Sequence, residues 1–379
     1  MRTLILFLFT AAAFAANPKI VGGPVAVNVT ARTATVVWIV QTDEATLRPA
    51  AGGATKTAPS LHMEKTTFTG LQPATRYEYN VSGQEAGKGS FLTPPATPAQ
   101  TPAATAGQPP AIPALTPTAA KPYKFVVYGD TRTRHDVHRR VMATLLKHGI
   151  PDFVVHTGDL VENGNDSALW PIFFDIEGEL LRHAAFFPVL GNHERNSRNY
   201  YEFFQAETPY YSFNWATAHF VMINSDVANV SASPGVQESF WAEQTRWMEE
   251  DLGKNQAADF RFVVAHHPPF SAVKRRQDSQ PKMTALVPLL EKYHVTAGLF
   301  GHDHNYQHYL KNGIHYIGTG GGGAPIYDVD IPAPGITVKV MSTENFVTFN
   351  VDGKVARVEA FDAEGKTIDQ FELHGGAQR

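Results

Sequence analysis

The sequence predicts an α/β protein preceded by a small all-β unit, and three features of the chain support this fold class. Apolar runs of strand length alternate with amphipathic helical segments beyond residue 123. Short runs with period-two alternation precede residue 93, and a proline-rich stretch separates the two regions. Hydrophobic residues make up 43% of the 379 positions and the net charge is −4. This composition argues against a disordered chain and against a basic nucleic-acid-binding protein.

The first 15 residues are typical of a secretory signal peptide. Arg2 supplies the positive start, an apolar run follows at residues 4–9, and small residues at 13–15 suit cleavage. We therefore expect a secreted or periplasmic protein. No later stretch is long and apolar enough to span a membrane, so we expect no transmembrane segment in the mature protein. The absence of cysteine excludes disulfides, thiolate metal sites and cysteine nucleophiles.

Residues 16–93 are predicted to form a small β-sandwich, because short alternating runs are separated by turn residues. The stretch from Leu71 to Tyr77 resembles the tyrosine corner of fibronectin type III-like domains, and Trp38 is the expected core tryptophan. Residues 94–122 contain nine prolines among Ala and Thr, which predicts an extended, semi-rigid linker. Such a spacer would also suit attachment of the protein to a surface.

Beyond the linker, apolar strands and amphipathic helices alternate, which predicts a sheet covered on both faces. Helices are expected around residues 137–145, over 238–252 with Gly253 as the stop signal, and over 284–293. From Phe346 onward the period changes to two, which predicts β-hairpins. At about 45 residues these hairpins are too small for independent stability, so we expect them to complete a second sheet of the same domain. The expected strands cover residues 124–128, 153–155, 187–190, 220–223, 262–265 and 297–300.

Five short clusters of Asp, Asn and His follow directly after apolar runs. They are Gly129-Asp130, Gly158-Asp159, Gly191-Asn192-His193-Glu194, His266-His267-Pro268 and Gly301-His302-Asp303-His304. A side chain at this point faces the crevice at the carboxyl end of a strand. Taken singly, such an Asp is more often a turn or helix cap, and such a His is more often packing or surface. Their joint occurrence favours a site for divalent metals, which oxygen and imidazole donors suit.

Phosphoryl transfer by two metals needs a carboxylate shared between the ions, further oxygen and imidazole donors, and room for a bridging hydroxide. Six residues supply that set: Asp130, Asp159, Asn192, His266, His302 and His304.

In this order, the five motifs resemble those of the calcineurin-like metallophosphoesterase superfamily. Together with the N-terminal sandwich they resemble most the purple acid phosphatase branch. The resemblance implies that residues 123–379 form a four-layer αββα sandwich, in which two β-sheets are flanked by helices and the metals lie at the strand ends.

The resemblance also implies a role for each site residue. The first metal would be held by Asp130, Asp159 and His304. The second would be held by Asp159, Asn192, His266 and His302, so that Asp159 bridges the two ions. His193 would lie beside the scissile phosphate, where it stabilises charge or protonates the leaving oxygen. Glu194 would orient a neighbouring group.

Two positions depart from the family pattern. The purple enzymes have a tyrosine three residues after the bridging aspartate, where this chain has Glu162. Without that tyrosine, the charge-transfer colour and the preference for ferric iron should disappear. Many other superfamily members have a histidine two residues after the first aspartate, where this chain has Arg132, which can contact phosphate oxygens but cannot ligate a metal. We interpret His267 as supporting a ligand or facing the substrate.

These observations predict a secreted, binuclear, acid-phosphatase-like phosphoesterase that hydrolyses phosphate monoesters by attack of a metal-bridging hydroxide. The expected cofactors are two divalent ions, which can be manganese, iron or zinc. The expected partner is a small phosphate ester rather than a nucleic acid, bound by Arg132, His193 and His267, with His193 and Asp159 as catalytic residues. The first alternative is a phosphodiesterase acting on cyclic nucleotides or other diesters, since the ligand set does not distinguish these substrates. The second is a non-catalytic surface binding protein with a degenerate phosphatase domain.

Overall fold

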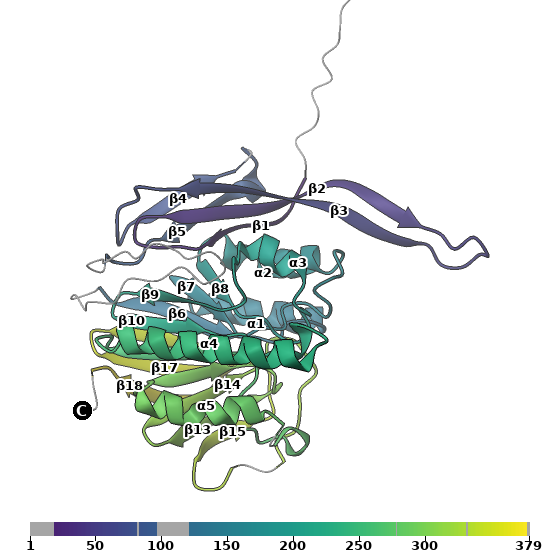
Figure 1. Cartoon of the computed structure of the whole chain (residues 1–379). Coiled ribbons are helices and arrows are strands. Elements are labelled where there is room, and N and C mark those ends of the chain that lie inside the picture. Colours follow the sequence, from purple (N-terminus) through teal and green to yellow (C-terminus); the bar gives the residue numbers. More distant parts are fainter. Residues whose placement is uncertain (1–18, 82, 97–120, 278, 331–332, 377–379) are drawn as a thin grey trace, which may run out of the picture.

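The computed structural model describes residues 19–81, 83–96, 121–277, 279–330 and 333–376. The predicted signal peptide and most of the predicted linker lie outside these residues. Two large β-sheets make up most of the described chain (Figure 1). Among the described residues, no helix combines the length and the apolar character that crossing a membrane requires.

The first sheet has nine strands and contains both ends of the described chain. Its centre is parallel, because β6, β7 and β8 run in the same direction, and the strands from the C-terminal region join it through antiparallel pairing with β6. In spatial order the strands are β18 (Thr367–His374), β17 (Val355–Asp362), β16 (Asn345–Asp352), β6 (Tyr123–Tyr128), β7 (Phe153–His156), β8 (Ala185–Pro188), β1 (Lys19–Val27), β2 (Ala34–Leu47) and β3 (Lys56–Phe68).

The second sheet has seven strands, with β10, β11, β12 and β14 parallel at its centre. In spatial order they are β15 (Thr337–Met341), β13 (Tyr306–Lys311), β14 (Ile314–Thr319), β12 (Ala297–Phe300), β11 (Phe260–Ala265), β10 (Ala218–Met222) and β9 (Tyr211–Trp215).

Helices cover the outer face of each sheet, so the domain has four layers. The helices α1 (His135–Lys147), α2 (Trp170–Leu181) and α3 (Arg198–Phe204) pack with the first sheet around one apolar core. The helices α4 (Pro234–Lys254) and α5 (Pro281–Lys292) pack with the second sheet around another. A third core fills the space between the sheets, where Phe125, Phe220 and Phe262 contact one another. This arrangement matches the αββα sandwich that the resemblance implied.

The predicted C-terminal hairpins are present, but they extend the first sheet rather than completing the second. Strand β16 pairs with β6, and the ring of Phe349 stacks on that of Phe125 at a centroid distance of 4.4 Å. Alternate residues of β16, Val347, Phe349 and Val351, thus face the core between the sheets. The expected stop at Gly253 is also corrected, since α4 continues to Lys254.

The N-terminal region consists of strands, as predicted, but its sheet does not stop at a domain boundary. Strand β1 pairs with β8 through Ala26 and Ala185, so β1, β2 and β3 extend the first sheet. The strands β4 (Arg76–Asn80) and β5 (Lys88–Leu92) form a separate hairpin. The hydroxyl of Tyr77 accepts a hydrogen bond from the backbone N–H of Gln72 at 2.7 Å, which is the contact expected of a tyrosine corner.

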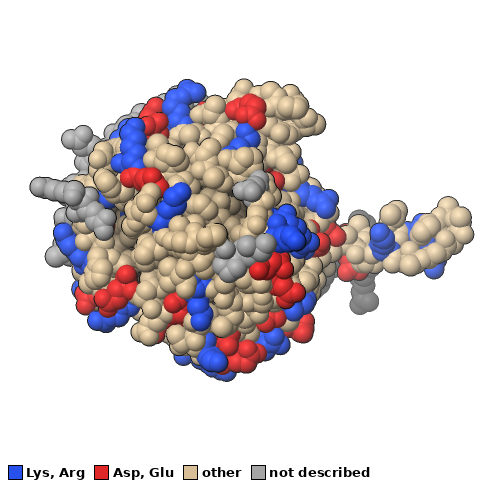
Figure 2. Space-filling model, turned by 90° about the horizontal axis from the view of Figure 1, so that it is seen from below, with Lys and Arg blue, Asp and Glu red and all other residues tan. Residues whose placement is uncertain are grey.

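The surface carries charges of both signs. On the face shown in Figure 2, basic and acidic side chains are interspersed and form no continuous basic area. This distribution agrees with the small net charge of the chain.

Candidate metal centre

The candidate ligands lie where parallel strands of both sheets end. Asp130 follows β6 and Asp159 follows β7, while His266 and His302 follow β11 and β12 of the other sheet. The backbone turns sharply at three of them, because φ is 59° at Asp130, 56° at Asp159 and 65° at His302. These residues with left-handed backbone conformation follow the strands directly, and their side chains face the common site at the carboxyl ends of the parallel strands of both sheets.

Two glycines permit the close packing of the ligand loops. A Cβ atom at Gly191 would lie 2.2 Å from Oδ1 of Asp159, and one at Gly301 would lie 2.5 Å from Oδ2 of Asp130. Neither distance is compatible with a side chain. Glycine at these positions therefore lets the backbone approach the two carboxylates.

One group of possible ligands consists of Asp130, Asp159 and His304, whose ligand atoms lie within 4.8 Å of one another. Nε2 of His304 is 3.3 Å from Oδ1 of Asp130. Nδ1 of His304 lies 2.7 Å from the carbonyl oxygen of Pro325, a contact that places the proton on Nδ1 and leaves the lone pair on Nε2. These three residues are the set that the resemblance implied for the first metal.

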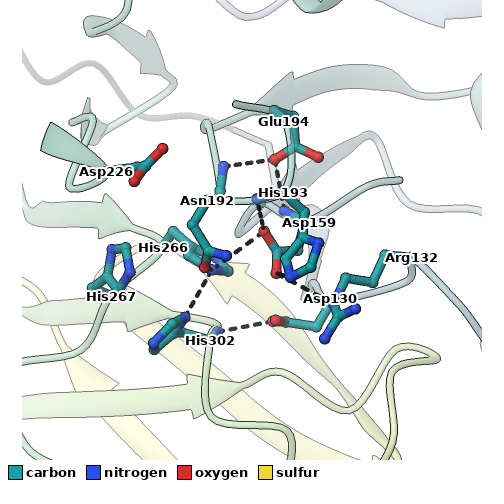
Figure 3. Close-up of polar contacts among 12 residues, drawn as sticks. Asp130, Arg132, Asp159, Asn192, His193, Glu194, Asp226, His266, His267 and His302 are labelled. Atoms are coloured by element: carbon teal, nitrogen blue, oxygen red, sulfur yellow. Dashed lines mark hydrogen bonds and ion pairs between the residues drawn. The ribbon is translucent and has the colours of Figure 1, made fainter. Parts of the chain in front are cut away.

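The second group surrounds His266. Its Nε2 lies 3.1 Å from Oδ1 of Asn192, 3.1 Å from Nδ1 of His302 and 3.5 Å from Oδ1 of Asp159. Nδ1 of His266 donates to the carbonyl oxygen of Thr157 at 2.9 Å, so Nε2 faces the centre of the group. The structure thus brings together the four residues implied for the second metal (Figure 3).

His267 lies closer to this group than the sequence suggested. It can supply a ligand atom together with His266 and His302, and its ring lies 4.1 Å from that of His302. Its Nδ1 is 2.9 Å from Oγ of Ser225. His267 therefore packs against a ligand candidate and is itself a candidate ligand, in addition to the supporting or substrate-facing role that we expected.

The donor set fits a divalent cation. Oδ1 of Asp130 is buried and has no hydrogen-bond partner among the described residues, which is costly unless a cation satisfies it. Burial lowers the pKa of His302 and of His267 well below the ordinary value, and neighbouring histidines add to this effect, so that both rings stay neutral and able to ligate. Burial alone would raise the pKa of Asp130, but its contacts with His304 and His266 lower it.

His193 and Arg132 lie together on one side of the candidate ligands, opposite His267 and Asp226 (Figure 3). Nδ1 of His193 donates to the carbonyl oxygen of Glu162 at 2.8 Å, and its Nε2 is 3.9 Å from Oδ2 of Asp159. Nε of Arg132 is 3.5 Å from the same oxygen, and Nη1 of Arg132 forms an ion pair with Oε2 of Glu162. The residues expected to face substrate thus lie beside the expected bridging aspartate.

Glu194 supports two of the ligand loops from behind. Oε2 accepts hydrogen bonds from the backbone N–H groups of Gly191 at 2.7 Å and Asp159 at 2.9 Å, and Oε1 accepts from Leu160 at 2.7 Å. The side chain is fully buried. Burial and the charge of Asp159 raise the pKa of Glu194 to about 8, and the backbone donors oppose this rise. A cation bound to Asp159 would neutralise one of the charges that cause the rise.

Asp226 lies beside the candidate ligands, and the sequence analysis did not identify it as a site residue. It is 5% exposed, accepts a hydrogen bond from Nδ2 of Asn229 at 2.8 Å, and lies on the same side as His267 (Figure 3). Burial raises its pKa. A signal was present, because Asn224, Ser225 and Asp226 follow an apolar strand, as the five clusters do.

Comparisons with known proteins agree with this geometry. The family described as calcineurin-like phosphoesterase matches residues 123–306. Tartrate-resistant acid phosphatase type 5 of Rattus norvegicus is 29% identical over an alignment of 202 residues, and the match covers 45% of this chain and 61% of the rat protein. The chain thus spans about three fifths of this relative's length.

Two solved structures share the fold. Purple acid phosphatase PPD1 from yellow lupin (Lupinus luteus) seeds superposes with a TM-score of 0.67 at 15% identity, over 93% of this chain and 74% of the lupin chain. The structure of PhoD superposes with a TM-score of 0.63 at 11% identity, over 97% of this chain and 95% of the other. At these identities the likeness concerns the fold alone. The sequence match shows that residues 123–306 of this chain form a calcineurin-like phosphoesterase domain, which is similar in sequence to an acid phosphatase and shares the fold of a purple acid phosphatase.

Proposed function

We propose that this protein is a secreted, acid-phosphatase-like phosphoesterase that uses two divalent metal ions to hydrolyse phosphate monoesters. One observation carries the proposal: two groups of possible metal ligands meet at Asp159. Asp159 shares one group with Asp130 and His304, and its Oδ1 is 3.5 Å from Nε2 of His266 in the second group. Such a shared carboxylate is what a two-metal phosphoryl-transfer site requires.

The two groups would hold the ions as follows. Asp130, Asp159 and His304 would bind one ion, and Asp159, Asn192, His266 and His302 would bind the other. Carboxylate, amide and imidazole donors suit manganese, iron or zinc. When bound, the ions would supply positive charge for the phosphate oxygens and would lower the pKa of water for attack on phosphorus.

His193 and Arg132 would act on the substrate itself. The contact of His193 with the carbonyl oxygen of Glu162 fixes its ring, so that Nε2 points toward the site. As an imidazolium, His193 would stabilise charge on the leaving oxygen or donate a proton to it from Nε2. Arg132, whose Nε is 3.5 Å from Oδ2 of Asp159, would contact a phosphate oxygen from the same side.

The test is to load the purified protein with manganese or zinc and to assay p-nitrophenyl phosphate and bis-p-nitrophenyl phosphate. We expect faster turnover of the monoester, and a fall of about 100-fold or more in Asp159→Asn if that carboxylate is shared by the ions. Asp175→Asn is the matched control, since Asp175 is an exposed residue that pairs with Arg139. Full turnover in Asp159→Asn would refute the bridging role.

The same assay separates the alternatives. Preferential turnover of the diester would support a phosphodiesterase. Stoichiometric metal with no hydrolysis of either ester would instead support a non-catalytic binding protein.

We also propose export through the N-terminal signal and a fibronectin type III-like character for residues 16–93, followed by a spacer at 94–122. The contact between Tyr77 and Gln72 supports the second point. Export predicts that the mature protein starts after residue 15, which N-terminal sequencing of the exported protein would test.

A further inference from the structure

Arg132 and Glu162 form an ion pair at the edge of the candidate metal centre. Nη1 of Arg132 contacts Oε2 of Glu162, while Nε lies 3.5 Å from Oδ2 of Asp159. The side chain of Arg132 is only 12% exposed, and its Nε has no hydrogen-bond partner among the described residues. The guanidinium is therefore held beside the expected bridging aspartate, and its Nε–H remains available to donate a hydrogen bond.

The carboxylate of Glu162 lies on the solvent side of this pair. Its side chain is 46% exposed, against 12% for Arg132. The backbone carbonyl of Glu162, not the carboxylate, is the acceptor for Nδ1 of His193 at 2.8 Å. Oε1 is 3.6 Å from the same nitrogen. The carboxylate can therefore leave Arg132 without removing the hydrogen bond that holds His193.

The ion pair reduces the positive charge and the number of free N–H donors that Arg132 offers to a phosphate. A free arginine would offer a phosphate two parallel N–H donors and a full positive charge. Here one end of the guanidinium is occupied by a carboxylate, so Arg132 and Glu162 together carry no net charge. A phosphoryl group that binds Arg132 must displace that carboxylate or lie beside it. Because repulsion scales with charge, a dianionic phosphoryl group is penalised more than a monoanionic one.

We propose that Glu162 masks Arg132 and so reduces, without reversing, the site's preference for dianionic monoesters over monoanionic diesters. This inference rests on the proposed phosphoesterase function and names a specificity-determining residue for it. Glu162 acts through Arg132, and the effect should vanish when Arg132 is absent.

Two measurements test the masking. The first is calorimetric binding of inorganic phosphate to the manganese-loaded protein at pH 8, where phosphate is mostly dianionic. The second is kcat/KM for the monoester and the diester at the same pH. We expect Glu162→Gln to tighten phosphate binding by about 5-fold, the size expected for loss of a half-exposed ion pair. The ratio of monoester to diester kcat/KM should rise by a similar factor.

A double-mutant cycle gives the control. In an Arg132→Gln background, Glu162→Gln should change neither phosphate affinity nor the ester ratio. Asp175→Asn, which removes an exposed carboxylate from the Asp175–Arg139 pair, should also leave both unchanged. If Glu162→Gln proves poorly folded, Glu162→Asp shortens the reach to Arg132 and should shift both readouts in the same direction.

Weaker phosphate binding in Glu162→Gln, or an equal change for both esters, would overturn the proposal. An effect that persists without Arg132 would overturn it too, since the carboxylate would then act on the metals directly. If the wild type binds phosphate but hydrolyses neither ester, the proposed function fails, and the binding measurement still decides whether Glu162 masks Arg132.

Discussion

Replacing Glu194 with glutamine should destabilise the protein and weaken its metal centre together. The carboxylate accepts hydrogen bonds at 2.9 Å or less from three backbone N–H groups, those of Gly191, Asp159 and Leu160. A glutamine keeps one acceptor oxygen and turns its NH₂ group toward at least one of these donors. Because the pKa of Glu194 is about 8, the carboxylate is charged only above that pH. There each hydrogen bond to it contributes about 1.5–3 kcal/mol, so losing one or two should lower the free energy of unfolding by about 1.5–6 kcal/mol.

The assay is urea unfolding of the metal-free protein at about pH 9, above the pKa of Glu194 and followed by tryptophan fluorescence, together with manganese titration. Because Glu194 holds the loops that carry Asp159 and Asn192, manganese affinity should fall by about 10- to 100-fold. Glu202→Gln is the matched control, since Glu202 makes an i,i+4 pair with Arg198 and should change stability by about 0.5 kcal/mol or less. An unfolding free energy for Glu194→Gln equal to that of Glu202→Gln would show that the buried carboxylate does not support these loops.

Three further outcomes are expected. Asp130→Asn removes a buried carboxylate with an unpaired oxygen, so most of the increase in the thermal unfolding midpoint that added manganese gives should disappear. Burial and the neighbouring His308 lower the pKa of His315 to about 4, below its ordinary value of 6.5. The folded state therefore binds this proton more weakly than the unfolded chain. Stability should fall by about 1–2 kcal/mol as the pH drops from about 6.5 toward 4, after allowance for partial exposure. His315→Gln should flatten that fall in unfolding measurements between pH 4 and 7, and a slope equal to that of wild type would contradict this assignment. Tyr77→Phe removes the hydrogen bond from the backbone of Gln72 and should cost about 1 kcal/mol in urea unfolding, with phosphatase activity unchanged.

The strands that carry the ligands were predictable because their apolar runs are continuous and end in polar residues. Asp130 and Asp159 follow buried strands, and the structure places them at the carboxyl ends of the neighbouring parallel strands β6 and β7. What sequence reasoning could not supply is which sheet a late strand joins. The hairpin around Phe349 has the same alternation whichever sheet it extends, and packing against Phe125 decides the matter.

The sequence analysis did not predict α2, β3 or the position of Asp226, because the local sequence pattern of each is weak. The helix α2 is rich in apolar and aromatic residues, and Phe173 and Phe174 face the core. A short continuous apolar run of this kind fits a buried strand as well as a buried helix, so hydrophobic periodicity does not identify it. Strand β3 is largely exposed and shows no apolar alternation over most of its length. Asp226 follows an apolar strand, as the candidate ligands do, but it has no neighbouring glycine or histidine, so its sequence signal is weak.

The pairing of β1 with β8 has a consequence for how the chain can be divided. Strand β8 would otherwise be the last strand of its sheet, with its outer N–H and C=O groups unpaired. The N-terminal strands cover that edge and contribute Ala26, Val36 and Phe91 to the core between the sheets. A shortened chain starting at residue 121 would thus present a bare strand flanked by apolar surface, a template for self-association. By covering this strand, the N-terminal region should protect the phosphoesterase domain from self-association.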